Sequence, residues 1–385
     1  MKILFCQWDS ICEYDMDKAL VHLGHQVKRL VRKINSVDYD KEYLKVLSEH
    51  LLKEQYDIVF SVNYIPIIAR VCKVFHTLYL SWTVDSPLFQ FYSDTIHYDC
   101  NRIFCFDQTL YQEFVNENLE HIFHMPLAAN VNHLNEILPT KDDVERFSSE
   151  ISFVGSLYTE KCKYNEISNM PDYLKGYVDG LIEAQLKIYG YNFIQDVLPE
   201  DIVAALKSCI GWLPLGEDYK ENDRAIVAQE YIGIKCSEIE RKRMLAALSK
   251  EHQVKLYTLS DSSELTRVTN MGPAHSRVDM PKIFKCSKIN LNITAKTIRS
   301  GLSQRIFDVM GAGGFLITNY QAELPNYFDI GKDLVVYDSE ADLLQKCDYY
   351  LNHEQERVAI ARSGYEKVKK YHTFELRFEK MIQML

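Results

Sequence analysis

Short apolar runs alternate with amphipathic segments over the first ~130 residues of the chain. The runs are typical of buried strands, and the segments between them repeat apolar residues at helical spacing. Strands that alternate with helices indicate βαβ units and a parallel sheet. Strands are predicted at residues 2–6, 26–31, 58–61, 77–81 and 102–106, and helices at 15–23 and 43–53.

The same alternation resumes after a polar segment, Pro139–Ser149, which we interpret as a linker into a second domain. Between residues 165 and 250 the spacing is helical, which indicates a helical insertion. The last predicted helix, 373–385, carries one apolar face. Strands of this half are predicted at 151–155, 254–259, 289–293, 315–318 and 333–337.

These elements predict an α/β protein built from two Rossmann-like domains that face each other. The first covers residues 1–140 and is joined by 371–385, because the terminal helix is free to cross back to it. The second covers 150–370 and contains the insertion at 165–250. Ligands of such sheets bind beyond the carboxyl ends of the strands, so the loops that follow strands are where functional residues are expected.

The composition excludes several classes of function. The net charge is −10 and basic residues form no run, so duplex nucleic acid is not expected as a partner. No apolar run reaches the ~18–20 residues of a membrane span. The ten cysteines show no metal-binding spacing and are expected as free thiols. Because a strand pattern begins directly at the N-terminus, we expect no signal peptide and a cytoplasmic protein.

The most informative segment runs from Leu291 to Pro325. It predicts a strand end, a polar loop with Arg299, Gly301 and Arg305, a helix over 304–310, a glycine cluster and a buried strand. Helix N-terminal N–H groups and two guanidinium groups together favour an anion, most readily a diphosphate. Asp308, one turn further, could accept hydrogen bonds from a ribose. The alternative is an Arg305–Asp308 ion pair on a helix that the glycines merely cap.

Two other sets of loops carry polar candidates. The predicted strand 151–155 leads into a second glycine loop, with Gly155, Ser156 and Lys161. In the first domain the loops after strands are rich in aromatic and acidic residues, which suit a polyol or carbohydrate better than a phosphate. They include Gln7–Ser10 and Trp82–Pro87.

The tyrosines of the helical insertion have two interpretations. Large aromatic side chains can fill a helical core, or they can form a sugar- or peptide-binding surface. They are Tyr164, Tyr173, Tyr177, Tyr189 and Tyr191.

At these positions the sequence resembles a known family, the CgeB-like glycosyltransferases related to spore-maturation proteins. MKILFCQWDSICEYD, SWTVDSP, NRIFCFD and IFHMPLAAN resemble the N-terminal half of that family. SFVGSLY, INLNIT, RSGLSQRIFDVMGAGGFLITNYQAEL and the segment HEQERVAIARSGY…HTFELR resemble its group-1-like C-terminal transferase domain. The resemblance implies a GT-B fold, with the donor nucleotide-sugar on the C-terminal domain and the acceptor on the N-terminal domain.

The resemblance also implies roles for individual residues on the donor side. Asp308 stands where group-1 transferases place the second glutamate of a pair that binds the donor. Ser300 stands at the position of the first glutamate, eight residues earlier, and is neutral. Gly155, Ser156 and Lys161 would contact the pyrophosphate. Arg299, Gly301 and Arg305 would neutralise the departing diphosphate, and Arg277 would either reach the donor or lie on the surface.

An inverting transfer needs a base for the acceptor hydroxyl. Asp85 is the first candidate and Asp9 the second, because both follow predicted strands of the first domain. The alternative for each is a helix cap or a turn acceptor. If the reaction retains configuration, neither role applies. The D-x-D triplets 15–17 and 38–40 do not follow strands, so we expect no metal.

The sequence therefore predicts a metal-independent glycosyltransferase of hexosyl or N-acetylhexosaminyl type. It would take a nucleotide-sugar, with UDP favoured, as co-substrate without a further cofactor, and a glycan or protein as acceptor. Two alternatives stay open, a nucleotide-sugar epimerase of the same fold and a non-catalytic nucleotide-sugar-binding pseudo-transferase. The sequence leaves the oligomeric state open, a homo-oligomer included.

Overall fold

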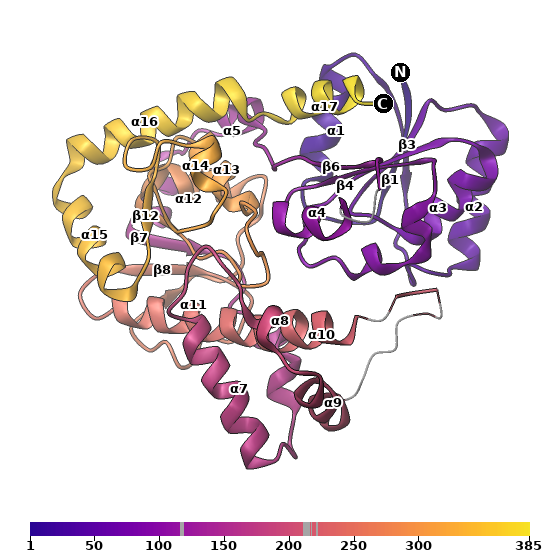
Figure 1. Ribbon diagram of the computed structural model, residues 1–385. Coiled ribbons are helices and arrows are strands. Elements are labelled where there is room, and N and C mark those ends of the chain that lie inside the picture. Colours follow the sequence, from indigo (N-terminus) through magenta and orange to yellow (C-terminus); the bar gives the residue numbers. More distant parts are fainter. Residues whose placement is uncertain (116–118, 211–215, 217, 221) are drawn as a thin grey trace. The chain divides into compact units, whose positions relative to one another are not determined.

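The computed structural model describes residues 1–115, 119–210, 216, 218–220 and 222–385, and the chain divides into two compact units (Figure 1). Each unit contains a six-stranded parallel sheet with helices packed on it. The predicted α/β class with two Rossmann-like units is therefore confirmed. Unit 1 comprises Met1–Leu127, Leu213–Asn222 and Phe374–Leu385, and unit 2 comprises Ala128–Trp212 and Asp223–Thr373.

The sheet of unit 1 has the strand order β2-β1-β3-β4-β5-β6. Its strands are β1 (Lys2–Gln7), β2 (Gln26–Val31), β3 (Ile58–Val62), β4 (Leu78–Trp82), β5 (Asn101–Cys105) and β6 (Ile122–His124). Its helices are α1 (Glu13–His22), α2 (Lys41–Lys53), α3 (Pro66–Phe75), α4 (Gln108–Val115) and α17 (Phe374–Gln383). Two short 3₁₀ helices, Phe89–Tyr92 and Asp94–His97, follow β4.

Side chains of alternate residues point to opposite faces of this sheet. Leu4 and Val59 belong to the core that the sheet shares with Tyr43 of α2. On the other face Phe60 meets the ring of Phe378 of α17 edge-on, with centroids 5.4 Å apart. The apolar face of α17, visible in the sequence, thus completes unit 1, where α17 packs beside α1 (Figure 1).

The sheet of unit 2 has the order β12-β11-β10-β7-β8-β9. Its strands are β7 (Ser149–Val154), β8 (Val254–Tyr257), β9 (Thr269–Asn270), β10 (Ser287–Asn292), β11 (Leu316–Asn319) and β12 (Val335–Tyr337). From β7 the chain adds β8 and then β9 on one side of β7. It then returns and adds β10 on the opposite side of β7. The strand order therefore reverses between β7 and β10.

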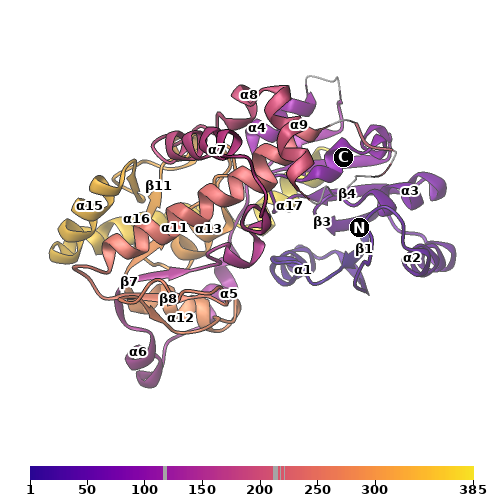
Figure 2. The same cartoon turned by 90° about the horizontal axis from the view of Figure 1, so that it is seen from below.

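Helices cover both faces of this sheet and form the predicted insertion between β7 and β8. α7 (Asp172–Gln185) and α11 (Ile234–Leu248) of the insertion contact each other (Figure 2). Outside the insertion lie α5 (Val131–Glu136), α6 (Lys141–Phe147), α12 (Asp279–Cys286), α13 (Gln304–Gly311), α14 (Leu324–Tyr327), α15 (Glu340–Asn352) and α16 (Glu354–Tyr371). The insertion contains α7 (Asp172–Gln185), α8 (Ile194–Val197), α9 (Glu200–Cys209), α10 (Asp223–Ile226), a π-helix (Val227–Gly233) and α11 (Ile234–Leu248).

Pro139–Ser149, which we interpreted from the sequence as a linker into a second domain, lies inside unit 2 and is largely helical. Lys141–Phe147 forms α6, because Thr140 and Asp143 make a reciprocal capping box at its start. Lys282 of α12 pairs with Asp143 at 3.0 Å and fixes this helix to the body of unit 2. Ser149, the last residue of the supposed linker, already begins β7.

None of the helices in the described part of the chain combines the length and the apolar character that a bilayer crossing requires.

Candidate functional site

The reversal of strand order between β7 and β10 marks the place on unit 2 where a ligand is expected. The loop after β7 begins at Gly155, and the loop after β10 leads to α13. Because β7 and β10 are parallel neighbours, both loops leave the sheet at the same edge. The predicted donor residues on these two loops are therefore close in the fold although ~145 residues separate them in the sequence.

Arg241 connects these two loops through hydrogen bonds. This arginine of α11 is 9% exposed, and its guanidinium donates to the carbonyl oxygen of Ser156 at 2.6 Å and to that of Ile293 at 2.6 Å. The guanidinium also lies over the ring of Tyr158, 4.5 Å from the centroid. A buried cation thus stands at the point of strand reversal and fixes the backbone of both loops.

The start of α13 carries the predicted diphosphate and ribose residues. Ser303 precedes the helix with an extended backbone, and its hydroxyl donates to Asn292 at the end of β10. Arg305 donates to Asp308 at 3.1 Å, and Gln304 donates to the other oxygen of Asp308 at 2.7 Å. The ion pair anticipated as the alternative is therefore present, with side chains 20% and 26% exposed. Both groups remain accessible at the helix start.

The environment of Asp308 changes its acidity. Desolvation by the surrounding protein raises its pKa, and the charge of Arg305 together with the hydrogen bond from Gln304 offsets only part of that rise. An acid with a raised pKa that still accepts two hydrogen bonds is held in one orientation. It can accept further hydrogen bonds from hydroxyl groups when it is ionised.

Ser300 lies beside a carboxylate that is remote in the sequence. Its hydroxyl donates to Glu323 at 2.8 Å, and the two residues are 6% and 2% exposed. Gln321, two residues before this glutamate, donates to the carbonyl oxygen of Gly301 at 3.3 Å. The loop after β11 thus holds the 299–301 loop in place. It also brings the carboxylate of Glu323 next to Ser300, the neutral residue that stands where group-1 transferases have a glutamate.

Arg299 lies on the same loop and lines a shallow hollow of about 10 Å³ at the edge of the sheet. Lys296 and Asn319 border the same hollow, so it joins the ends of β10 and β11. Along the chain, Arg299 thus precedes Ser300 and Gly301 on the loop, and Arg305 follows them on α13.

The glycine cluster after α13 has a structural explanation. Gly313 has φ +80°, as expected for a residue that ends a helix in the left-handed conformation. A Cβ atom on Gly314 would lie 2.7 Å from the carbonyl oxygen of Phe284, so only glycine fits there. Both glycines shape the turn into β11, which agrees with the capping interpretation.

The loop after β7 holds Ser156 firmly but leaves Lys161 at the surface. The Ser156 hydroxyl donates to Glu160 at 2.8 Å and accepts from the backbone N–H of Tyr158. Gly155 would tolerate a Cβ at ordinary contact distances, so it is not required sterically. Lys161 is exposed, with its ammonium 5.8 Å from the ring centroid of Tyr158.

Arg277 is exposed in the loop before α12. Its carbonyl oxygen lies 2.9 Å from the Nε2 atom of His133. Arg305 reaches the same helix, since its Nη1 atom lies 3.1 Å from the sulfur of Met280. Arg277 therefore precedes the helix, α12, that Arg305 contacts.

In unit 1 Asp85 stands on a rigid loop after β4. Asn63, which follows β3, donates its amide to Asp85 Oδ2 at 2.7 Å and accepts from the backbone N–H groups of Val84 and Asp85. On the other side the Ser86 hydroxyl donates to the buried Asp107 at 2.9 Å. Asp85 itself is exposed. It is thus an accessible carboxylate on a fixed backbone.

Asp9 is exposed after β1 and has φ 77°. Its N–H donates to Glu13 at 3.2 Å, and the N–H of Trp8 donates to the same carboxylate at 2.8 Å. Burial raises the pKa of Glu13, and the backbone hydrogen bonds offset part of this. Glu13 therefore fixes the loop and leaves the Asp9 carboxylate at the surface.

Carboxylates of both D-x-D triplets have structural partners. Asp17 makes two hydrogen bonds with Arg29, at 2.7 and 2.9 Å. Asp40 caps α2 by accepting the N–H of Tyr43 at 3.0 Å, and it also holds Asn35. These contacts explain why acidic residues stand at these positions.

Sequence reasoning missed four residues of these sites: Arg241, Glu323, Asn63 and Glu13. The first two lie ~60 residues before and ~20 residues after the donor loop, and neither belongs to a local pattern. Asn63 had one signal, since asparagine before a helix that starts with Pro66 is typical of a left-handed turn residue. Glu13 also had a signal in the sequence, because it is an acidic residue at the start of a helix, four residues after Asp9.

Comparison with known proteins places these observations in a wider group. Residues 241–383 match the model of a family described as glycosyl transferase-like. This segment begins at Arg241 and includes the loop 299–301 and α13, whereas Asp85 and the loop after β7 lie outside it. Among curated proteins no sequence matches the chain.

Solved structures share the fold of this chain over its full length at low sequence identity. A glycosyltransferase from Rickettsia africae is 11% identical, with a TM-score of 0.59 over 100% of this chain and 97% of that one. A sucrose-phosphate synthase from Thermosynechococcus elongatus is 9% identical, with a TM-score of 0.59 over 100% and 98%. The Anabaena protein HepE in complex with UDP is 9% identical, with a TM-score of 0.55 over 100% of both chains.

These likenesses show the fold. Two six-stranded parallel sheets, each in its own unit, form the GT-B type of fold found in these structures. Residues 241–383 are thus similar to the glycosyl transferase-like family, and the chain as a whole has a fold that solved glycosyltransferases share.

Proposed function

We propose that the chain is a metal-independent glycosyltransferase of the CgeB-like group. In this proposal it moves a hexose-type sugar, of hexosyl or N-acetylhexosaminyl type, from a UDP-sugar to a glycan or protein. The observation that carries the proposal is the group formed by the 299–301 loop and α13. This group offers two guanidinium groups, a helix N-terminus and the oriented carboxylate of Asp308 next to the reversal of strand order.

In the donor site Arg299 and Arg305 would bind the diphosphate, and Asp308 would accept the ribose hydroxyls. Negative charge on the leaving diphosphate grows as its bond to the sugar breaks, so fixed cations lower the barrier. Gly155, Ser156 and Lys161 would border the pyrophosphate, Ser300 and Gly301 the sugar, and Arg277 the outer end of the nucleotide. Glu323 would supply, through Ser300, the acidic environment that group-1 transferases obtain from a glutamate at that position.

UDP is the favoured nucleotide for a specific reason. The structure of HepE, whose fold this chain shares, was solved with UDP, with UDP and glucose, and with UDP-glucose. A UDP-sugar is therefore the first donor to test.

For an inverting reaction Asp85 would be the base. Its carboxylate would take the proton of the acceptor hydroxyl while the hydroxyl oxygen attacks the anomeric carbon and UDP leaves. Asn63 holds Asp85 on its loop without covering it, as an accessible base requires. Asp9 is the second candidate, at the neighbouring reversal of strand order between β1 and β3.

The experiment is to incubate the protein with UDP-glucose, UDP-galactose and UDP-N-acetylglucosamine, with and without EDTA, and to measure UDP release and sugar configuration. UDP release that EDTA does not change, and that Asp308→Asn reduces, supports the proposal. A change of sugar configuration without UDP release would identify the epimerase. Intact donor together with measurable UDP binding would identify the pseudo-transferase, the alternative that the neutral Ser300 favours.

A further inference from the structure

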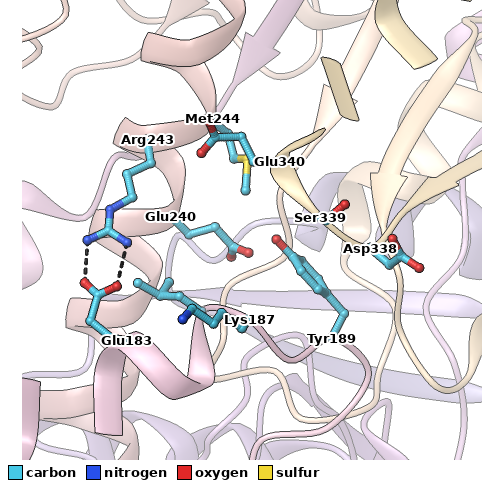
Figure 3. A pocket seen from close by; sticks show the side chains of 10 residues that line it. Glu183, Lys187, Tyr189, Glu240, Arg243, Met244, Asp338, Ser339 and Glu340 are labelled. Carbon is cyan, nitrogen blue, oxygen red and sulfur yellow. Dashed lines mark hydrogen bonds and ion pairs between the residues drawn. The ribbon is translucent and has the colours of Figure 1, made fainter. Parts of the chain in front are cut away.

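Unit 2 contains a second cavity, which is lined by residues outside the 299–301 loop and α13. It has a volume of about 240 Å³ and is bordered by the end of α7, one face of α11 and the loop between β12 and α15. Figure 3 shows the carboxylate of Glu240 and the hydroxyl of Tyr189 turned toward each other inside it. Leu186 and Met244 add apolar walls.

Glu240 is the feature of this cavity that needs explanation. Its side chain is 1% exposed, and its Oε1 atom lies 3.0 Å from the ammonium of Lys296. Neither carboxylate oxygen has a well-formed hydrogen bond to any described residue. A buried carboxylate normally accepts several hydrogen bonds, and leaving that capacity unused is costly. The second oxygen of Glu240 is therefore an acceptor that a ligand can use.

Two phenols beside Glu240 are in the same situation. The hydroxyl of Tyr189 faces the Glu240 carboxylate without well-formed hydrogen-bond geometry, and the buried hydroxyl of Tyr337, which lies behind the residues that line the cavity, has no hydrogen-bond partner among the described residues. Their rings meet edge-on with centroids 5.9 Å apart. Desolvation and the nearby charge of Glu240 raise the pKa of both phenols, and for Tyr189 the interaction of its hydroxyl with the Glu240 carboxylate adds to the rise. The cavity thus combines the carboxylate of Glu240 with the neutral hydroxyl of Tyr189.

The charges around the cavity indicate a neutral ligand. Glu240 is already balanced by Lys296, and at the rim Glu183 pairs with Arg243 through two hydrogen bonds. The remaining acidic residues, Asp338 and Glu340, are exposed and lie at the start of α15, where solvent and the helix dipole stabilise them. With Lys187 the rim carries charges of both signs, and the buried charge of Glu240 is already balanced by Lys296, so the cavity has no excess charge that favours an ion.

We propose that this cavity binds a neutral polyol of about the size of one sugar residue. Its hydroxyl groups would donate to Glu240 and accept from Tyr189, and Leu186 and Met244 would contact its apolar face. The volume lies below the ~300–1,000 Å³ of pockets for larger ligands, which fits one sugar ring and excludes a nucleotide. The proposal does not depend on the proposed glycosyl transfer, because binding alone defines it.

The test is calorimetric titration of the full chain with D-glucose, D-galactose and N-acetyl-D-glucosamine, first alone and then with saturating UDP. Binding in the millimolar range is expected for at least one sugar, since few contacts must offset the cost of ordering. Tyr189→Phe removes a hydroxyl without removing packing, and we expect it to weaken binding roughly fivefold or more. The matched control is Tyr257→Phe, which removes a buried, equally unpartnered hydroxyl of β8.

Sugar binding that Tyr189→Phe weakens, that Tyr257→Phe leaves unchanged and that UDP does not displace supports the proposal. Glu240→Gln is a second variant and is expected to weaken binding more strongly. Absence of binding for all three sugars would overturn the proposal, and so would displacement by UDP or equal affinity in wild type and Tyr189→Phe. Because UDP release is measured separately, a failure here is distinct from a failure of the proposed transferase function.

Discussion

The two sheets have closely related topologies, but the edges where their strands end carry different chemistry. At the edge of unit 1 the described loops present Asp85 and Asp9 on backbones that Asn63 and Glu13 hold in place. At the edge of unit 2 the loops are joined by Arg241, and the start of α13 adds Arg305 and Asp308. A parallel sheet with a reversal of strand order therefore fixes where a ligand binds, whereas a few loop residues decide which kind.

The two sheet edges also differ in the segments whose side chains hold them in place. The contacts that hold the edge of unit 1 come from side chains of neighbouring loops, such as Asn63 and Asp107. The edge of unit 2 depends on the helical insertion as well, because Arg241 belongs to α11. The insertion between β7 and β8 thus contributes directly to the edge of unit 2 where we propose that the donor binds.

Asp85→Asn is the variant with the largest expected effect, and it tests the role proposed for the edge of unit 1. The asparagine keeps an oxygen for the hydrogen bond from Asn63 but cannot take a proton, so kcat should fall by about 10²–10⁴-fold for an inverting reaction. UDP affinity should not change. Asp9→Asn changes the second candidate for the base, and it should keep most activity if Asp85 is the base. Full activity of Asp85→Asn would remove the acceptor-side base from the account.

Glu238→Gln tests the ion pairs that hold α11 to the segment after β7 within the insertion. Lys235, Lys242 and Asn165 surround this carboxylate at 3.0 Å, and although burial opposes ionisation they lower its pKa from 4.5 to about 2. A depressed pKa gives stability that is complete above pH 4.5 and is lost as the pH falls toward 2. The wild type should therefore lose roughly 3 kcal/mol over that interval.

The measurement is urea unfolding at several pH values. Glu238→Gln should be less stable at pH 7 by a similar amount and should show a flatter pH profile. Glu264→Gln is the matched control, because Glu264 pairs with the same Lys242 but is 72% exposed. It should cost less than about 1 kcal/mol. Equal losses in the two variants would contradict the structural role of Glu238.

Asp308→Asn sharpens the assignment of the donor edge. The loss of a charged acceptor should weaken UDP binding roughly tenfold. Because burial raises the pKa of Asp308, wild-type affinity should fall on acidification at a pH above the ordinary 3.8 of an aspartate. The variant should lack that part of the pH dependence. Asp342→Asn, which breaks an ion pair with Lys346 on α15, is the control and should bind UDP normally.

Ser300→Ala is expected to have the smallest effect. It removes the hydroxyl that donates to Glu323 and should lower kcat/KM for a UDP-sugar about three- to tenfold, with unchanged affinity for UDP. A competition assay between two UDP-sugars checks whether the preference for one sugar changes as well. Equal loss of UDP and UDP-sugar binding would mean that Ser300 only holds the loop.

Much of the fold could be predicted because buried parallel strands are continuous apolar runs. Gln26–Val31 was predicted with the bounds that β2 has, and the helix at 304–310 differs from α13 by one residue. The errors fall where a polar or proline-containing segment starts a helix. Thr140 and Asp143 signal α6 locally, and Pro66 stands at the first position of α3, where its missing N–H costs nothing.

The candidate sites were predictable only as far as their residues are close in sequence. The run from Arg299 to Asp308 is one local segment, so its residues could be grouped. Arg241 and Glu323 reach the same edge through the fold, from α11 and from the loop after β11, and no local pattern marks them. The tyrosines of the insertion likewise divide by tertiary context, since Tyr189 lines a cavity whereas Tyr173 is exposed.

The most direct test of the donor edge on unit 2 is a calorimetric titration of the full chain with UDP in the presence of EDTA. The account predicts saturable binding to one site per chain, unchanged when EDTA is replaced by Mg²⁺ and at least tenfold weaker in Arg305→Gln. No binding to the wild type, or binding that requires the added metal, would contradict it.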